Sequence, residues 1–190
     1  MQEAIQDMKE SVGESKYATW RENLESLVWA IALAVLIRFL VISPFKIPSG
    51  SMRMTLIEKD RILVSKFIYK FREPKRGEIV VFHNPMDNRP FIKRLIAVGG
   101  DHVEIREGKI FVNDQPLEGA EVFVSNHYYN QGAFGAPGQV VEVPARSYYV
   151  LGDNSASSHD SRFWGFVPER LMIGHAVCIF WPLNRIRLLR

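Results

Sequence analysis

One serine and one lysine of this chain could together carry out acyl transfer. Ser51 lies in the run Pro48-Ser49-Gly50-Ser51-Met52, and Lys93 lies further along in Phe91-Ile92-Lys93-Arg94. A serine hydroxyl becomes a good nucleophile when a base removes its proton, and lysine is a recurring alternative to histidine as that base. The lysine amine must then be neutral, so burial has to lower its pKa from about 10.4. The two residues therefore indicate Ser-Lys hydrolase chemistry, provided that the fold brings them together.

The surroundings of Lys93 predict a β strand. Lys93 and Arg94 interrupt an apolar run over residues 91–98. Because successive side chains of a strand point to opposite faces, we expect one of the two to be buried and the other solvated. Each motif alone also has an ordinary explanation, since most strand lysines are solvated and Pro-Ser-Gly-Ser is a common turn sequence.

A third motif makes the combination specific. It consists of Gly152-Asp153-Asn154, followed by Asp-Ser-Arg-Phe-Trp-Gly over residues 160–165. An apolar segment, the serine motif, the lysine motif and this third motif follow one another in the order that is typical of one family. The chain resembles the bacterial type I signal peptidases, membrane-bound Ser-Lys proteases that cut signal peptides from exported proteins. The resemblance covers residues 27–190.

The resemblance implies a role for each matching residue. Ser51 would be the nucleophile and Lys93 the general base, while the Ser49 hydroxyl and the Ser51 backbone N–H would form the oxyanion hole. Ser158 would orient the lysine amine. Residues 155–157 are Ser-Ala-Ser and differ from the family pattern, which leaves open whether Ser158 or a neighbouring serine has that role.

Further residues would support the site and bind the substrate by the same resemblance. Asp160 and Arg162 match a structural ion pair, and Asp153 matches another acid of that motif. The substrate would have small residues at the first and third positions before the cut. We expect shallow apolar pockets for them, with these candidate walls: Ile47, Met52, Leu56 and Ile92.

Other chemistries fit the sequence less well. The five histidines are scattered without the spacing of a metal site, and no glycine-rich phosphate-binding loop is present. We therefore expect neither a metal nor a cofactor. His159 beside Asp160 suggests a Ser-His-Asp arrangement with Ser51, but adjacent side chains diverge and rarely orient one another. A Ser-Lys pair is therefore favoured.

An apolar segment precedes the serine motif. The run Leu27–Ile37 contains no polar residue, and we predict a transmembrane helix over residues 24–43 that ends at Pro44. A cleavable signal sequence is disfavoured, because the preceding tail is acidic and no small-x-small site follows the run. A buried globular helix is disfavoured because the run has no polar face.

We predict three parts of the chain: an acidic tail over residues 1–23, the membrane helix over 24–43, and a catalytic domain over 44–190. Residues 1–26 carry a net charge of −3 and the remainder +6. By the positive-inside rule, the basic residues after the helix would place the domain in the cytoplasm. The resemblance implies the opposite: a single-pass protein of the inner or plasma membrane with its domain on the extracytoplasmic face. Long domains can translocate regardless of flanking charge.

The domain itself is predicted to be all-β. Short runs rich in β-branched and aromatic residues recur, and residues 103–112 alternate on both sides of Glu107-Gly108-Lys109, which is typical of a hairpin. Such spacing favours a partly barrel-like antiparallel domain. Residues 113–138 are rich in Asn, Gly and Pro, and we expect a loop or insertion without a catalytic role.

These observations favour a membrane-anchored serine endopeptidase whose partners are the signal peptides of exported preproteins and the lipid bilayer. The net charge of +3 is too small to indicate nucleic-acid binding. A self-cleaving regulator of the repressor type would use the same pair of residues, but it would need a DNA-binding helix-turn-helix where this chain has its apolar segment. A non-catalytic peptide-binding domain would not need both Ser51 and Lys93.

Overall fold

The structure is a computed structural model of the chain, and it describes residue 20, residues 23–35 and residues 42–189. The chain divides into two units, before and after the boundary between residues 41 and 42. In the first unit, residues 23–35 are helical. No helix among the described residues is both long and apolar enough to span a bilayer. Residues 36–41 of the predicted membrane helix, and most of the predicted tail over 1–23, lie outside the described residues.

The end of the predicted membrane helix requires a correction. Ile42 and Ser43 were expected to be helical, but they begin strand β1 (Ile42–Lys46), which pairs with strand β2 (Arg61–Ser65). β1 lies at the edge of its sheet, where Pro44 is tolerated because no ladder hydrogen bond is needed from its nitrogen. The second unit therefore starts at Ile42 rather than at Pro44.

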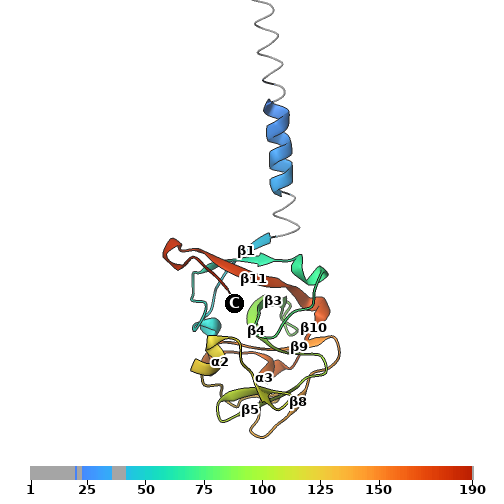
Figure 1. Ribbon diagram of the computed structural model, residues 1–190, viewed down its shortest axis with the longest axis vertical. Helices are drawn as coiled ribbons and strands as arrows, with labels where there is room; N and C mark the ends of the chain where they lie inside the picture. The colour runs from blue at the N-terminus through green and yellow to red at the C-terminus, as the bar shows by residue number, and fades with distance from the viewer. Residues whose placement is uncertain (1–19, 21–22, 36–41, 190) are drawn as a thin grey trace, which may run out of the picture. The chain divides into compact units, whose positions relative to one another are not determined.

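Two antiparallel sheets form the second unit (Figure 1). The larger sheet has the order β1-β2-β11-β3-β4-β9-β10, and β12 pairs with β11. Its remaining strands are β3 (Ile79–His83), β4 (Pro90–Val98), β9 (Ser147–Leu151), β10 (Val167–Pro168), β11 (Met172–Trp181) and β12 (Arg187–Leu188). This sheet is curled, because one hollow is lined by residues of both β1 and β4, which lie far apart in the strand order. The prediction of a mostly antiparallel, partly barrel-like fold is confirmed.

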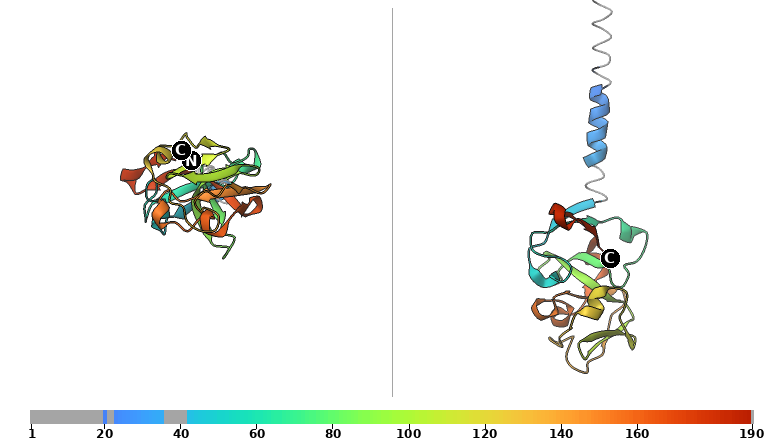
Figure 2. Two further views of the ribbon diagram at one scale, coloured as in Figure 1. Left: turned by 90° about the horizontal axis from the view of Figure 1, so that it is seen from below. Right: turned by 60° about the vertical axis from the view of Figure 1, so that its left-hand side comes forward.

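The smaller sheet lies at the other end of this unit from β1 (Figure 2). Its order is β7-β6-β5-β8, with β5 (His102–Arg106), β6 (Lys109–Val112), β7 (Gln115–Pro116) and β8 (Val141–Glu142). The predicted hairpin is confirmed, since Arg106 pairs with Lys109 around Glu107 and Gly108. Both turn residues have positive φ, 50° and 77°, which the two-residue turns of hairpins require.

Short helical turns connect the strands. They are α2 (Glu121–Ser125), α3 (Ser161–Trp164), and the 3-10 turns η1 (Gly50–Met52), η2 (Ile68–Lys70), η3 (Ser155–Ser157), η4 (Glu169–Leu171) and η5 (Leu183–Arg185). The predicted loop over residues 113–138 thus contains β7 and α2. The serine motif forms η1, and the third motif forms η3 and α3.

The core that supports η1 lies inside the curled sheet. Met52 and Leu56 are fully buried there, and they pack with Ile47 and with side chains of β2, β3 and β11. A second cluster packs the smaller sheet against β4 and β9. Burial of Met52, next to Ser51, holds the backbone of η1 against the sheet that carries Lys93.

Candidate active site

The side chains of Ser51 and Lys93 meet inside the second unit. Ser51 is presented by η1 and Lys93 by the middle of β4, where it pairs with Val80 of β3. Lys93 Nζ donates a hydrogen bond of 2.5 Å to Ser51 Oγ. Lys93 is only 3% exposed and Ser51 only 8%. This arrangement provides a nucleophile and a base within the reach that proton transfer requires.

Burial changes the chemistry of the Lys93 amine. Removal from water disfavours the charged form, and this lowers the pKa of Lys93 to about 8. The negative charges of Asp160 and Asp153 act in the opposite direction, and the charge of Arg162 acts with burial. Desolvation is the largest influence, so a substantial fraction of the amine is neutral in weakly alkaline solution.

Arg94 is also buried, contrary to our expectation that one of the two neighbouring cations would be solvated. Its guanidinium bonds both carboxylate oxygens of Asp153, at 2.8 and 2.7 Å, and donates to Gly77 O at 2.6 Å. Thr55 Oγ1 donates to the same carboxylate at 2.5 Å. The reason is that β4 lies between β3 and β9 and is covered on both faces, since the consecutive residues 93–97 are all buried. Thr55 belongs to no recognisable sequence motif, so its contact with Asp153 was not predicted.

A second buried ion pair lies in the third motif. Arg162 Nε donates to Asp160 Oδ1 at 2.8 Å, and neither side chain has exposed surface. Asp160 also accepts from Gly152 N at 3.0 Å. Arg162 donates further to Ser155 Oγ and to the backbone carbonyl of Tyr129. This ion pair therefore fixes the fold of the whole motif.

The hydrogen bonds of Ser155 and Ser158 can be compared with the predicted role of orienting Lys93. Ser155 Oγ is already bonded to Arg162 and to Tyr129 N. Ser158 Oγ is buried and has no hydrogen-bond partner in the described part of the chain, so the predicted bond from Ser158 to Lys93 is not formed in this structure. The Ser158 side chain packs instead against Gly152, where an added Cβ would lie 2.1 Å from Ser158 Oγ.

A hollow of about 330 Å³ opens beside Ser51 and Lys93. It is lined by Ser49, Ser157 and His159 among others, and it shares Pro48 and residues 90–92 with an adjoining hollow of about 240 Å³. The two hollows therefore adjoin at these shared residues. Together they form a groove between the β1 end and the start of β4.

Of the four predicted pocket residues, the structure places two at the groove. Ile47 and Ile92 line the smaller hollow. Met52 and Leu56 are fully buried and line neither of these two hollows, so their role as pocket walls stays a prediction. Met52 ends η1, and Leu56 follows in the next turn, where its N–H bonds Met52 O at 2.6 Å, so both side chains lie in the same core cluster.

His159 lies at the rim of the groove. Its side chain is exposed, and its ring stacks on that of Phe163 with centroids 5.0 Å apart. The carboxylate of Asp160 is engaged by Arg162 instead. The Ser-His-Asp arrangement that we considered is therefore not formed. Among the described residues, no group of three or more His, Cys, Asp or Glu side chains could hold a metal ion.

Known proteins resemble this chain over most of its length. The family described as "Signal peptidase, peptidase S26" matches residues 20–181. Signal peptidase I of Leptolyngbya laminosa is 41% identical over 173 residues, which span 87% of this chain and 81% of that protein. Probable signal peptidase I-2 of Synechocystis is 40% identical over 178 residues, 90% of this chain and 78% of that protein. A crystal structure of a signal peptidase I from Enterococcus faecalis matches 56% of this chain and 98% of its own, with 29% identity and a TM-score of 0.47.

Proposed function

The chain belongs to the signal peptidase family, peptidase S26, and on that premise we propose that Ser51 and Lys93 are the residues with which it cleaves peptide bonds. It is a serine peptidase that removes signal peptides. The observation that carries the residue assignment is the 2.5 Å hydrogen bond between Lys93 Nζ and Ser51 Oγ at a groove. This hydrogen bond places the base, Lys93, in direct contact with the nucleophile, Ser51.

In the proposed mechanism, the neutral Lys93 amine accepts the Ser51 proton as Oγ attacks the scissile carbonyl carbon. The resulting ammonium then donates that proton to the leaving amine nitrogen, which departs with the mature protein. The signal peptide remains as an ester on Ser51. Water, deprotonated by Lys93, attacks the ester carbonyl and releases the signal peptide, which restores the Ser51 hydroxyl.

The oxyanion of each tetrahedral intermediate needs hydrogen-bond donors. We assign this role to the backbone N–H of Ser51 and the hydroxyl of Ser49. Ser49 precedes η1, lines the groove, and does not use its hydroxyl to cap the turn. A donor that is fixed in place before the reaction stabilises the transition state without reorganisation.

The substrate binds as an extended strand in the groove. Within the described residues, β1 pairs with β2 alone, so its other edge is available to a peptide backbone. Ile47 and Ile92 would form walls of the subsites there. Apolar walls around a small volume admit alanine and exclude large side chains, which explains a preference for small residues at the first and third positions before the cut.

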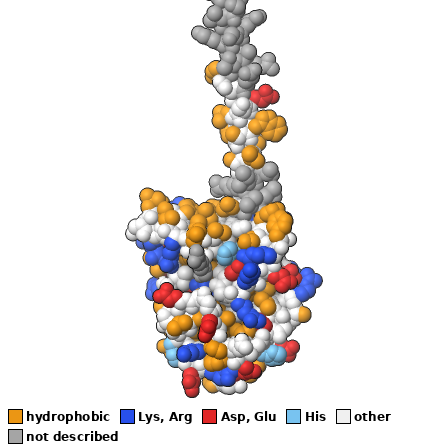
Figure 3. Space-filling model, in the orientation of Figure 1, with side chains coloured by type: hydrophobic (Ala, Val, Ile, Leu, Met, Phe, Trp, Pro, Cys, Tyr) orange, Lys and Arg blue, Asp and Glu red, His pale blue; other side chains and the backbone are white. Residues whose placement is uncertain are grey.

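The proposal includes a single membrane anchor, with the catalytic domain on the extracytoplasmic face where exported preproteins emerge. Its support is the apolar run Leu27–Ile37 in the sequence. Hydrophobic side chains also gather at one end of the second unit (Figure 3). The end of β11 and its connection to β12 expose three large hydrophobic side chains: Trp181, Leu183 and Ile186 are 48%, 68% and 59% exposed. Such a patch suits contact with lipid.

Cleavage of a purified preprotein tests the assignment. The detergent-solubilised enzyme should release one amino-terminal fragment, identified by mass spectrometry, whose last residue is small. Ser51→Ala should release none, because it lacks the nucleophilic oxygen, while its thermal unfolding stays close to that of the wild type. A folded Ser51→Ala enzyme that still turns over the preprotein would rule out Ser51 as the nucleophile.

A further inference from the structure

The segment after α2 contacts the third motif closely, although the sequence predicts no catalytic role for it. Asn126 Nδ2 donates to Asp153 O at 2.6 Å. Tyr129 N donates to Ser155 Oγ at 2.9 Å, and Phe134 N donates to Arg162 O at 2.8 Å. Of these three contacts, only that of Asn126 is made by a side chain of the segment. It can therefore be removed by substitution without disturbing the backbone.

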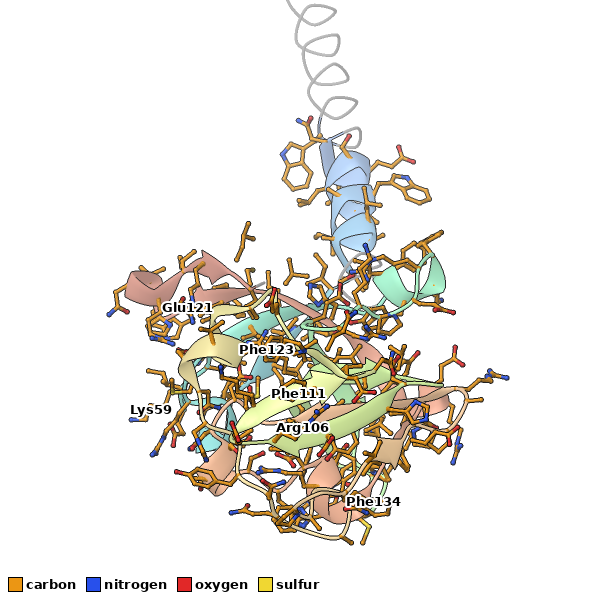
Figure 4. The ribbon with its side chains drawn as sticks, turned by 60° about the horizontal axis from the view of Figure 1, so that its bottom comes forward. Lys59, Arg106, Phe111, Glu121, Phe123 and Phe134 are labelled. Carbon is orange, nitrogen blue, oxygen red and sulfur yellow. The ribbon has the colours of Figure 1, made fainter. Side chains whose placement is uncertain are left out.

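Asn126 directly follows α2 and is held in place by it. Its backbone N–H bonds Val122 O and so ends α2. That helix carries exposed Glu121 on one side and Phe123, only 4% exposed, on the other (Figure 4). The Phe123 ring lies 5.8 Å from the Arg94 guanidinium. Packing of α2 thus fixes the direction from which the Asn126 amide reaches Asp153.

The peptide group between Asp153 and Asn154 is hydrogen-bonded at both of its ends. Its carbonyl oxygen accepts from Asn126, and its N–H donates to Ser51 O at 2.9 Å. The side chain of Asn154 adds a bond from Nδ2 to Gly50 O at 3.0 Å. One peptide plane therefore connects Asn126 directly to the backbone of the nucleophile.

We propose that Asn126 is a positioning residue for Ser51. Its amide fixes the plane of the Asp153–Asn154 peptide, and that peptide holds the carbonyl of Ser51. Hydrogen bonds in such a chain strengthen one another. Without the Asn126 bond, the buried Asp153 carbonyl has to turn toward another donor, and the peptide N–H turns away from Ser51 O. This inference rests on the proposed role of Ser51.

A matched control lies four positions further along the same segment. Asn130 Nδ2 donates to Ile105 O at 3.0 Å and to Gly135 O at 3.3 Å, and neither acceptor belongs to the third motif or to η1. Asn126→Ala and Asn130→Ala each remove one partly buried amide from one segment. They differ in whether the lost bond leads to Ser51.

The test measures kcat and KM of the full-length enzyme in detergent with a fluorogenic signal-peptide substrate, together with thermal unfolding. We expect Asn126→Ala to lower kcat by about 10- to 100-fold, since small misplacements of reacting groups have effects of that size, with KM within about twofold of the wild type. Asn130→Ala should keep kcat within about twofold of the wild type, even if its unfolding temperature falls as much as that of Asn126→Ala.

A second variant excludes the explanation that Asn126→Ala loses activity only because it misfolds or leaves a cavity. Asn126→Asp has nearly the same shape, but it presents a carboxylate oxygen to the Asp153 carbonyl instead of a donor. It should lose at least as much kcat as Asn126→Ala. Equal losses of kcat in the Asn126 and Asn130 variants, or a wild-type kcat in folded Asn126→Asp, would overturn the proposal. Wild type and Ser51→Ala are assayed alongside, so a failure of the Ser51 assignment is recognised separately.

Discussion

At the scale of single residues, the central problem is how a lysine can be neutral beside two carboxylates. Asp160 and Asp153 both favour the protonated Lys93 amine. Each of them, however, is paired with a buried arginine, Asp160 with Arg162 and Asp153 with Arg94. The arginines compensate the carboxylate charges, so desolvation decides the protonation state of the amine. We therefore propose that the two ion pairs serve the chemistry as well as the fold.

Breaking one of these pairs should show both effects. Arg162→Met leaves Asp160 buried and uncompensated, which destabilises a protein by about 3–5 kcal/mol. In the fraction that folds, the pKa of Lys93 should rise, because the charge of Arg162 lowers it in the wild type. Urea unfolding and the pH dependence of cleavage measure the two effects.

The double variant Arg162→Met with Asp160→Asn provides the control. It removes both charges and should regain part of the lost stability and return the pKa of Lys93 toward that of the wild type. If Arg162→Met unfolds at the urea concentration of the wild type, the pair has no such role.

At the scale of elements, the sequence predicted what depends on local patterns. The alternation around Glu107 and Gly108 was sufficient for the hairpin, because turn conformation is a property of those residues themselves. The apolar run around Lys93 was sufficient for β4. The motif order was sufficient to select Ser51 and Lys93, which the structure places in contact.

What depends on strand order could not be predicted in the same way. One of Lys93 and Arg94 was expected to be solvated. Alternation places them on opposite faces of the strand, but it does not tell whether both faces are covered. Burial of Met52 and Leu56 depends on the strands that pack around them, and the segment around Asn126 acts through long-range hydrogen bonds. None of these has a local pattern in the sequence.

The groove between β1 and β4 makes a prediction of its own. Ile92→Ala enlarges the smaller hollow, so substrates with leucine in place of alanine at the first or third position before the cut should improve. We expect kcat/KM for the leucine substrate, relative to alanine, to rise about tenfold or more, as a change of a few methylene groups in a pocket allows. Met54 is 56% exposed and lines neither hollow. Met54→Ala should therefore leave the ratio unchanged, and an unchanged ratio in Ile92→Ala would remove Ile92 from the subsite.

At the scale of the whole molecule, charge and family indicate opposite orientations. The basic residues after the apolar run favour a cytoplasmic domain, whereas the substrates of a signal peptidase emerge on the outer face. A long folded domain can be translocated in spite of flanking charge. We therefore expect the second unit, from Ile42 onward, on the extracytoplasmic side.

Protease protection decides between the two orientations. A protease added to spheroplasts should digest the domain after residue 42 and spare an epitope tag at residue 1. The same treatment after permeabilisation should remove both. If the domain is protected until the membrane is opened, the positive-inside count gives the correct topology and the proposed orientation is wrong.

The most direct test of the Ser51–Lys93 assignment is the pH dependence of kcat/KM for the wild type, Lys93→Arg and His159→Ala. Above its pKa the Lys93 amine is neutral and can accept the Ser51 proton, so the wild-type rate should rise with pH through an apparent pKa of about 8. Arginine keeps the charge but cannot act as the base, so Lys93→Arg should be inactive at every pH, whereas His159→Ala should keep the wild-type profile. An active Lys93→Arg enzyme, together with a wild-type profile near the ordinary histidine pKa of about 6.5 that disappears in His159→Ala, would contradict the account.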